Sequence, residues 1–156
     1  MTTGIVLLNF GEPSEGHRED VLDYLERIFL ANMSIEGETT EAAARERAAE
    51  LAKRRVPGLM EEYDEIGGSP LIDHATTQAE MLDEELSRRG YDVETYHGMQ
   101  YTAPFITDAV EAAREDGVDH LIGLPIYPLC GPSTTVQSLD ELDEALDEVG
   151  WDVPVD

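Results

Sequence analysis

The chain has 156 residues, of which 41% are hydrophobic, and its 35 acidic and 10 basic residues give a formal net charge of −25. This length suits one domain with a core of its own, and the charge excludes a general surface for nucleic acid or anionic membranes, because both need a positive field. The single cysteine, Cys130, excludes a disulfide framework and a thiolate zinc cluster. We expect this thiol to be a small buried hydrophobe at a strand end.

Most of the acidic residues fall on the polar faces of segments with helical periodicity, such as residues 41–50, 80–85 and 140–148. Two interpretations are open: a solvated acidic shell suited to high salt, or an acidic patch for a cationic partner. The scarcity of Lys and Arg and the lack of a long acidic block favour the first. No secretory leader and no long apolar run occur, so we expect a cytoplasmic protein.

A first buried strand is predicted at residues 4–10, and Gly11 ends it. No GxGxxG motif follows, so the sequence predicts a Rossmann-like sheet without an NAD site. Apolar residues then recur at helical spacing over residues 19–30. The end of this helix, at Ile28 and Phe29, serves either as core packing or as an apolar lip over a flat ligand.

A second helix is predicted over residues 41–54, and it closes on a basic triplet at residues 53–55. Cations in a last helical turn complement the helix dipole, whereas Arg is also suited to paired contacts with ligand carboxylates. Pro57 is expected to start a further helix that runs through Tyr63.

Ser69 precedes a proline, so it is expected to be extended and to cap a helix at residues 72–89. Residues 91–96 alternate in polarity, which is typical of a strand near a sheet edge. The loop at residues 97–101 should follow that strand, and a crossover helix is predicted at residues 105–114.

The apolar run at residues 121–127 predicts a strand covered on both faces. Ser133, Thr134 and Thr135 follow it and precede a helix at residues 139–149. These hydroxyls either cap that helix or form one wall of a ligand site, because open α/β sheets bind ligands at the carboxyl ends of their strands. A fourth strand is expected from residue 151, and the chain stops within it, which predicts a half or a fragment of a larger protein.

Five segments, in this order and spacing, resemble the N-terminal half of ferrochelatase, and the resemblance covers nearly all of the chain. They are NFGEP, LERIFL, AKRRVPGLMEEYDEIGGSPL, GMQYTAPFITDAV and LPIYPLCGPSTTVQS. The resemblance implies an α/β, Rossmann-like, chelatase-type fold with a parallel four-stranded sheet flanked by helices, which is one half of a two-domain protein. It also implies insertion of ferrous iron into a porphyrin.

The resemblance further implies a porphyrin-binding set of residues, with an apolar lip, a carboxylate-binding end and a polar wall. Phe10 falls where some members carry an aromatic residue on the iron side, and a phenyl ring cannot ligate iron. The implied set is Phe10, Ile28, Phe29, Arg54, Arg55, Tyr63, Ser69, Ser133, Thr134, Thr135, Gln137 and Ser138.

In the family the catalytic histidine, in a Ser-x-His motif, and a metal-side glutamate belong to the C-terminal half. We therefore expect no catalytic residue and no metal ligand within these residues, and His97 is the one histidine expected near the site. The implied substrates are Fe²⁺ and protoporphyrin IX or coproporphyrin III, with no cofactor, and the implied partner is the C-terminal half of the same enzyme. On this reading the chain by itself binds porphyrin weakly and does not catalyse.

Two other functions fit the sequence less well. One is a non-catalytic tetrapyrrole-binding or carrier domain. The other is a short homodimeric cobalt-type chelatase, which would need a histidine pair within one domain.

Overall fold

The computed structural model describes residues 1–13, 17–36 and 40–156, with the side chains of residues 34–36 left aside. The chain divides into two compact units. The first unit comprises Met1–Gly11 and Ile72–Asp156, and the second unit comprises Glu12–Leu71. Each is described by itself.

The first unit is built on a parallel three-stranded sheet of order β2-β1-β3. Its strands are β1 (Thr3–Asn9), β2 (Val93–Met99) and β3 (His120–Pro125). The most apolar strand, β1, lies in the centre and is buried almost throughout, whereas the alternating β2 lies at an edge. The predicted parallel sheet and the edge position of the second strand are both confirmed.

The predicted fourth strand is wrong, because the sheet has three strands in the described residues. Val155 makes only an isolated bridge with Leu121. Pro154 has no N–H to donate to a ladder, although its carbonyl accepts from the Leu121 amide at 2.8 Å. Trp151 and Val153 pack against the hydrophobic core instead of extending a strand.

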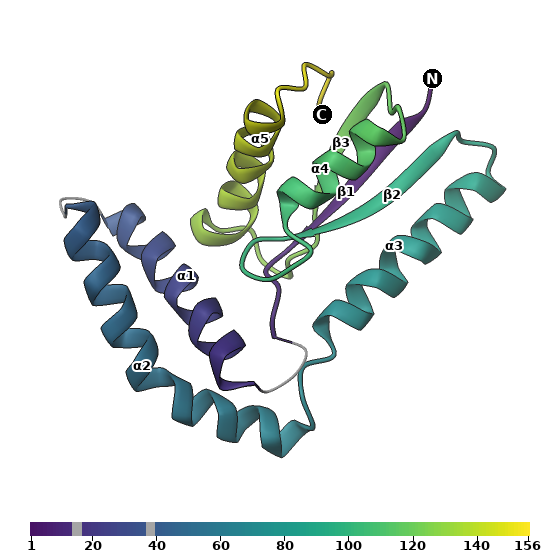
Figure 1. Ribbon diagram of the computed structural model, residues 1–156. Coiled ribbons are helices and arrows are strands. Elements are labelled where there is room, and N and C mark those ends of the chain that lie inside the picture. Colours follow the sequence, from purple (N-terminus) through teal and green to yellow (C-terminus); the bar gives the residue numbers. More distant parts are fainter. Residues whose placement is uncertain (14–16, 37–39) are drawn as a thin grey trace. The chain divides into compact units, whose positions relative to one another are not determined.

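Two helices, α4 (Ile106–Glu115) and α5 (Gln137–Val149), pack on one face of this sheet. The other face packs against α3 (Leu71–Arg88). Side chains of β1 alternate between the faces: Val6 and Leu8 join the α4–α5 core, and Ile5 and Leu7 join the α3 core. Figure 1 shows these three helices around the sheet.

The strand predicted to be covered on both faces is only partly so. Leu121 of β3 is fully buried, but Leu124 is 38% exposed. Cys130 is also exposed, which contradicts the expected buried thiol. The reason is that β3 ends at Pro125, so Cys130 lies in the loop beyond the sheet.

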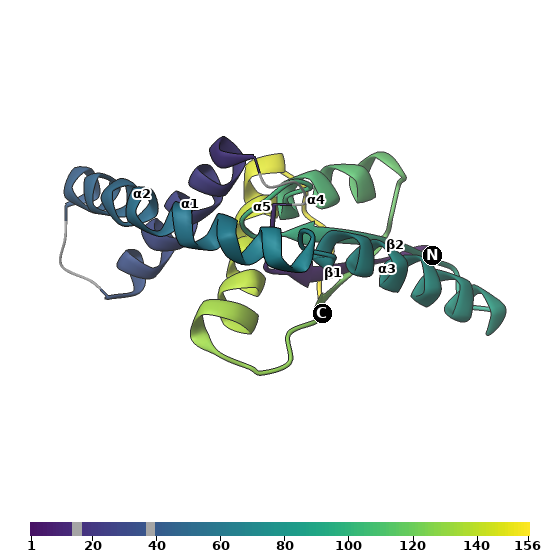
Figure 2. The ribbon, with the colours of Figure 1, turned by 90° about the horizontal axis from the view of Figure 1, so that it is seen from below.

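The second unit is a pair of helices, α1 (Arg18–Glu36) and α2 (Glu41–Ile66), which lie side by side (Figures 1 and 2). Small side chains of α2 recur every fourth residue on its buried stripe, at Ala44, Ala48 and Ala52. The α2 helix begins at the N-cap Thr40 and ends at Gly67, a glycine in the left-handed conformation that commonly ends helices.

The predicted helix boundary at Pro57 is wrong, because α2 runs through this proline without a break. A proline inside a helix removes one backbone hydrogen bond and bends the axis, and α2 is bent in Figure 1. Val56 and Tyr63 are buried on either side of the bend, so packing keeps the two segments in one helix. No helix in the described part of the chain is long and apolar enough to cross a membrane.

Candidate functional site

The carboxyl ends of the three strands meet at one edge of the first unit, as expected for a parallel sheet. Backbone hydrogen bonds continue past the strand ends there: the Gln100 amide donates to the Asn9 carbonyl at 3.0 Å, and the Tyr101 amide donates to the Phe10 carbonyl at 3.1 Å. Phe10 and residues 100–101 therefore lie side by side at this edge.

An aromatic pair marks this edge. The ring centroids of Phe10 and Tyr101 are 4.6 Å apart with an interplanar angle of 63°, an edge-to-face contact. Tyr101 is 4% exposed, and burial raises the pKa of its phenol to about 12. Phe10, which is partly exposed, thus packs on a buried ring whose hydroxyl stays protonated at physiological pH.

A network of hydrogen bonds centred on Glu141 joins α5 to the ends of β2 and β3. The Glu141 carboxylate accepts from the side-chain amides of Gln137 at 2.8 Å and Gln100 at 3.3 Å. Gln100 in turn accepts from the Tyr127 hydroxyl at 2.5 Å. The Gln137 amide also donates to the Tyr101 hydroxyl at 3.0 Å.

Burial is the main reason why the pKa of Glu141 is raised, and the nearby carboxylates of Glu144 and Asp140 raise it further. The two amide donors oppose this rise. Burial likewise raises the pKa of the Tyr127 phenol. The edge is therefore rich in hydrogen-bonding groups that resist ionisation.

The predicted hydroxyl loop forms a short π-helix, η1 (Pro132–Val136), directly before α5. The residue at the N-cap of α5 is Val136, and no side chain caps this helix. The capping interpretation of Ser133, Thr134 and Thr135 is therefore wrong. The Thr134 hydroxyl donates to the Gly131 carbonyl at 3.3 Å. Single-turn π-helices are common at functional sites, so a role in a polar wall remains a prediction.

Two further residues of the predicted wall lie at the start of α5. The fully buried Ser138 donates to the Thr135 carbonyl at 3.2 Å. Gln137 belongs to the Glu141 network. Its Oε1 atom is buried and lacks a hydrogen-bond partner among the residues that the structure describes.

In the second unit the basic triplet lies in the middle of α2 rather than in its last turn. The helix-dipole interpretation is therefore wrong. Arg54 is exposed. Arg55 donates to both carboxylate oxygens of Glu62, at 2.8 and 3.0 Å, and this hydrogen bond lowers the pKa of Glu62. A ligand carboxylate would have to compete with Glu62 for Arg55.

Ser69 and Tyr63 occupy the other end of the second unit. The Ser69 hydroxyl donates to the Glu12 carboxylate and accepts from the Leu71 amide at 3.3 Å, which confirms its predicted position at a helix start. Tyr63 is buried, and burial, with the Glu12 charge second, raises its pKa to about 12.

Ile28 and Phe29 are half-buried on α1. They are outside the buried core of the second unit, and their predicted role as a lip remains a prediction.

His97 lies within β2, opposite Leu7 of β1, and not in a loop. Alternation places its side chain on the face that packs against α3, with Val93 and Thr95. Burial lowers its pKa. Among the described residues no group of three or more His, Cys, Asp or Glu side chains could hold a metal ion.

Comparison with known proteins gives one consistent family. Residues 2–156 match the ferrochelatase family. The chain is 35% identical over 142 residues to a ferrochelatase of Gloeobacter violaceus, covering 90% of this chain and 42% of that protein. It is 32% identical over 154 residues to a ferrochelatase of Desulfotalea psychrophila, covering 98% of this chain and 47% of the relative. A mitochondrial ferrochelatase of Gallus gallus is 34% identical over 144 residues, which cover 90% of this chain and 34% of the relative.

The chain belongs to the ferrochelatase family. The resemblance stated from the five sequence segments is therefore confirmed. The chain spans less than half the length of each of these three ferrochelatases.

Sequence reasoning missed the side chains that tie the ferrochelatase-like sheet edge together, namely Gln100, Tyr101, Tyr127 and Glu141. Strand-end position was an available signal for the first three, since Gln100 and Tyr101 follow the alternating strand and Tyr127 ends the apolar run. Glu141 had the weaker signal of a helical i,i+4 spacing from Gln137. The burial of Glu141 depends on tertiary packing, so the sequence of a helix with many acidic residues gives no sign of it.

The raised tyrosine pKa values predict loss of stability at alkaline pH. Tyr63 and Tyr101 have a folded-state pKa of about 12, above the unfolded value of about 10. The contribution of these two phenols to the free energy of unfolding is complete at pH values below the unfolded-state pKa. It is lost as the pH rises through the folded-state pKa. We expect the melting temperature to fall between about pH 10 and 12, and less so in Tyr63→Phe and Tyr101→Phe. Absorbance at alkaline pH should show these two phenols ionising above the ordinary tyrosine value of about 10; ionisation of both at about pH 10 would contradict the prediction.

Proposed function

We propose that this chain is the N-terminal, porphyrin-binding half of a ferrochelatase, an enzyme that inserts ferrous iron into a porphyrin during haem biosynthesis. The observation that carries the proposal is the family match over residues 2–156. Iron and porphyrin are substrates, no cofactor is required, and the second half of the site comes from the C-terminal half of the enzyme. We also propose a cytoplasmic location.

The chemistry of the two units supports a tetrapyrrole as the ligand. A porphyrin is a flat apolar ring with carboxylates on its rim, so it needs aromatic and aliphatic surface together with a few cations and polar groups. Phe10, packed edge-to-face on the buried Tyr101, offers partly exposed aromatic surface. On the second unit, Ile28 and Phe29 are partly exposed apolar side chains, and Arg54 is an exposed cation.

Protons must leave the ring when the metal enters, and this chain is proposed to bind the ring rather than to remove those protons. His97 is directed toward α3 by the strand alternation, not toward the strand ends. We assign no catalytic base here. The family match favours neither the carrier domain nor the homodimeric cobalt-type chelatase.

A Soret titration of the chain with protoporphyrin IX and with coproporphyrin III tests the proposal. We expect saturable binding. Arg55→Ala should weaken it about five-fold because a charge-assisted contact to a carboxylate is lost. Glu62→Gln should strengthen it about three-fold, since Arg55 no longer has an internal carboxylate partner.

The matched control is Arg45→Ala, which removes another exposed arginine of α2 that pairs with a glutamate, Glu41. This variant should bind like the parent. An iron-insertion assay on the same samples should show no turnover by the chain alone. Absence of a Soret change with either porphyrin would refute the proposed ligand, and insertion by the chain alone would refute its assignment as a non-catalytic half.

A further inference from the structure

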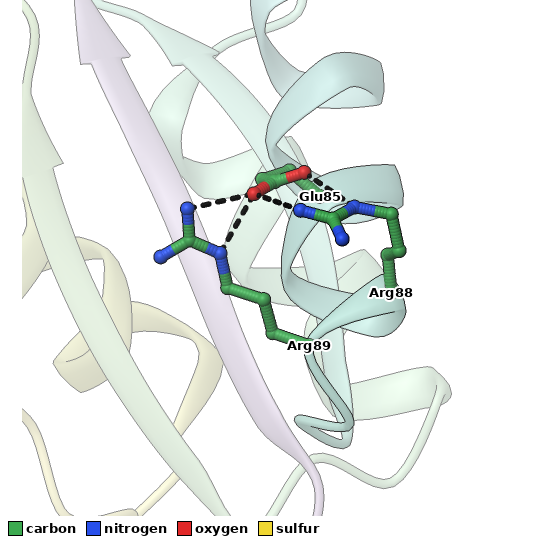
Figure 3. Close-up of polar contacts among 3 residues, drawn as sticks. All are labelled: Glu85, Arg88 and Arg89. Atoms are coloured by element: carbon green, nitrogen blue, oxygen red, sulfur yellow. Dashed lines mark hydrogen bonds and ion pairs between the residues drawn. The ribbon is translucent and has the colours of Figure 1, made fainter.

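The basic residues of the first unit are Arg88, Arg89 and Arg114. Arg88 and Arg89 follow one another at the C-terminal end of α3, and both bind the Glu85 carboxylate, at 2.7 Å each (Figure 3). Arg114, near the end of α4, donates to the Val149 carbonyl at 2.8 Å. Each of the two helices ends just before a strand begins, so these cations lie at the amino edge of the sheet.

The residues that the first unit places at the carboxyl edge of the same sheet therefore include a half-buried carboxyl group and no Lys or Arg. Glu141 is half-buried, and its partners there are the side-chain amides of Gln100 and Gln137. Gln100 itself is 7% exposed. A carboxylate removed from water is normally paired with a cation. Glu141 is bound by two side-chain amides instead, so its position at this edge has to be explained by what those amides do.

The geometry supplies one. Each amide that donates to Glu141 also contacts a phenol: Gln100 accepts from Tyr127, and Gln137 donates to Tyr101. An amide side chain has two distinguishable ends, and donation to Glu141 fixes which end faces each phenol. The carboxylate thus sets the orientation of two tyrosine hydroxyls from different strand ends.

We propose that Glu141 is a positioning residue for ligand binding: it orients Gln100 and Gln137, which fix the hydroxyls of Tyr127 and the buried Tyr101, and the partly exposed Tyr127 serves as an uncharged hydrogen-bonding wall for the tetrapyrrole ring. This inference rests on the proposed function. Because the first unit places no Lys or Arg at this edge, the wall is suited to the uncharged ring rather than to its rim carboxylates.

The proposal carries a pH dependence with a defined sign. The groups that face Glu141 are Asp140 and Glu144 on α5, Gln100 and Tyr101 after β2, and Tyr127 after β3. Ionised Glu141 is a strong acceptor for both amides, and the protonated form is a weaker one. Porphyrin affinity should therefore fall as the pH is lowered through the pKa of Glu141, which lies above its ordinary value because of burial.

The test is porphyrin titration of the whole chain as a function of pH, for the parent and for three variants. Glu141→Leu should bind at least five-fold more weakly at neutral pH. Glu141→Gln keeps an acceptor oxygen but cannot ionise, so its affinity should be intermediate and should lose the acidic transition. Glu148→Gln removes an exposed carboxylate near the C-terminal end of α5, which is not among the groups that face Glu141, and should behave like the parent.

Each outcome is decisive. Equal affinity and the same pH profile in parent and Glu141 variants would overturn the positioning role and leave the proposed function intact. Equal losses of affinity in Glu141→Leu and Glu148→Gln would overturn the positioning role, because the loss would then be a general effect of removing a charge from α5. Absence of porphyrin binding by the parent would overturn both. If Glu141→Leu fails to fold, the pH profile of Glu141→Gln decides the question alone.

Discussion

Replacing Gly11 by alanine is expected to destabilise the first unit by about 2–4 kcal/mol. Gly11 has φ of 82°, in the left-handed region, and an added Cβ would lie 2.4 Å from the Thr102 Oγ1 atom and 2.9 Å from the Met99 Cβ atom. The left-handed conformation costs an L-residue about 1 kcal/mol or more. The overlap adds to this, because the Thr102 hydroxyl is buried and cannot withdraw into solvent.

Gly150→Ala is the matched control within the same unit. Gly150 has φ of 66°, and nothing lies within 4 Å of its added Cβ, so this change should cost only about 1 kcal/mol. Urea unfolding of both variants, followed by circular dichroism at high salt, measures the difference. Equal free energies of unfolding would show that the close approach at Gly11 is relieved at no cost.

The melting temperature should rise by about 10 °C or more when KCl is increased from about 0.1 M to about 2 M. The cause is the net charge of −25, whose self-repulsion opposes the compact state. Screening shortens the Debye length from about 10 Å at 0.1 M to about 3 Å at 1 M. Surface carboxylates farther apart than this then interact little.

A variant of α5 separates this effect from a general salt response. Asp143, Glu144, Asp147 and Glu148 are exposed on that helix, and their replacement by Asn and Gln should raise the melting temperature at low salt and flatten its salt dependence. Thermal unfolding by circular dichroism across the KCl series provides the measurement. A melting temperature that does not change with KCl in the parent would exclude the acidic shell as an adaptation to high salt.

Sequence patterns predicted the elements whose signals are local. Branched apolar runs identified β1 and β3, and the alternating segment near Val93 identified an edge strand. The five family segments were enough to indicate the family because they carry residues in a fixed order.

The sequence predictions failed where the structure of a segment depends on residues that are close in space but distant in sequence. Pro57 is a local breaker, but burial of Val56 and Tyr63 keeps α2 continuous. Residues 151–156 are apolar enough for a strand, yet they make only an isolated bridge with the sheet, at Val155. Glu141 reads as one more surface acid, and only the tertiary structure shows two amides and two phenols gathered around it.

The strand order β2-β1-β3 has a consequence for how the protein is made. The central strand β1 has no partner until Val93–Met99 has been synthesised, and the whole second unit and α3 lie between them in the chain. During synthesis the apolar residues of β1 therefore stay without a strand partner, while α1 and α2 form from contacts that are local in sequence. Newly made chains that stall before β2 would expose this segment, which makes it the expected binding site for chaperones and the expected start of aggregation during expression.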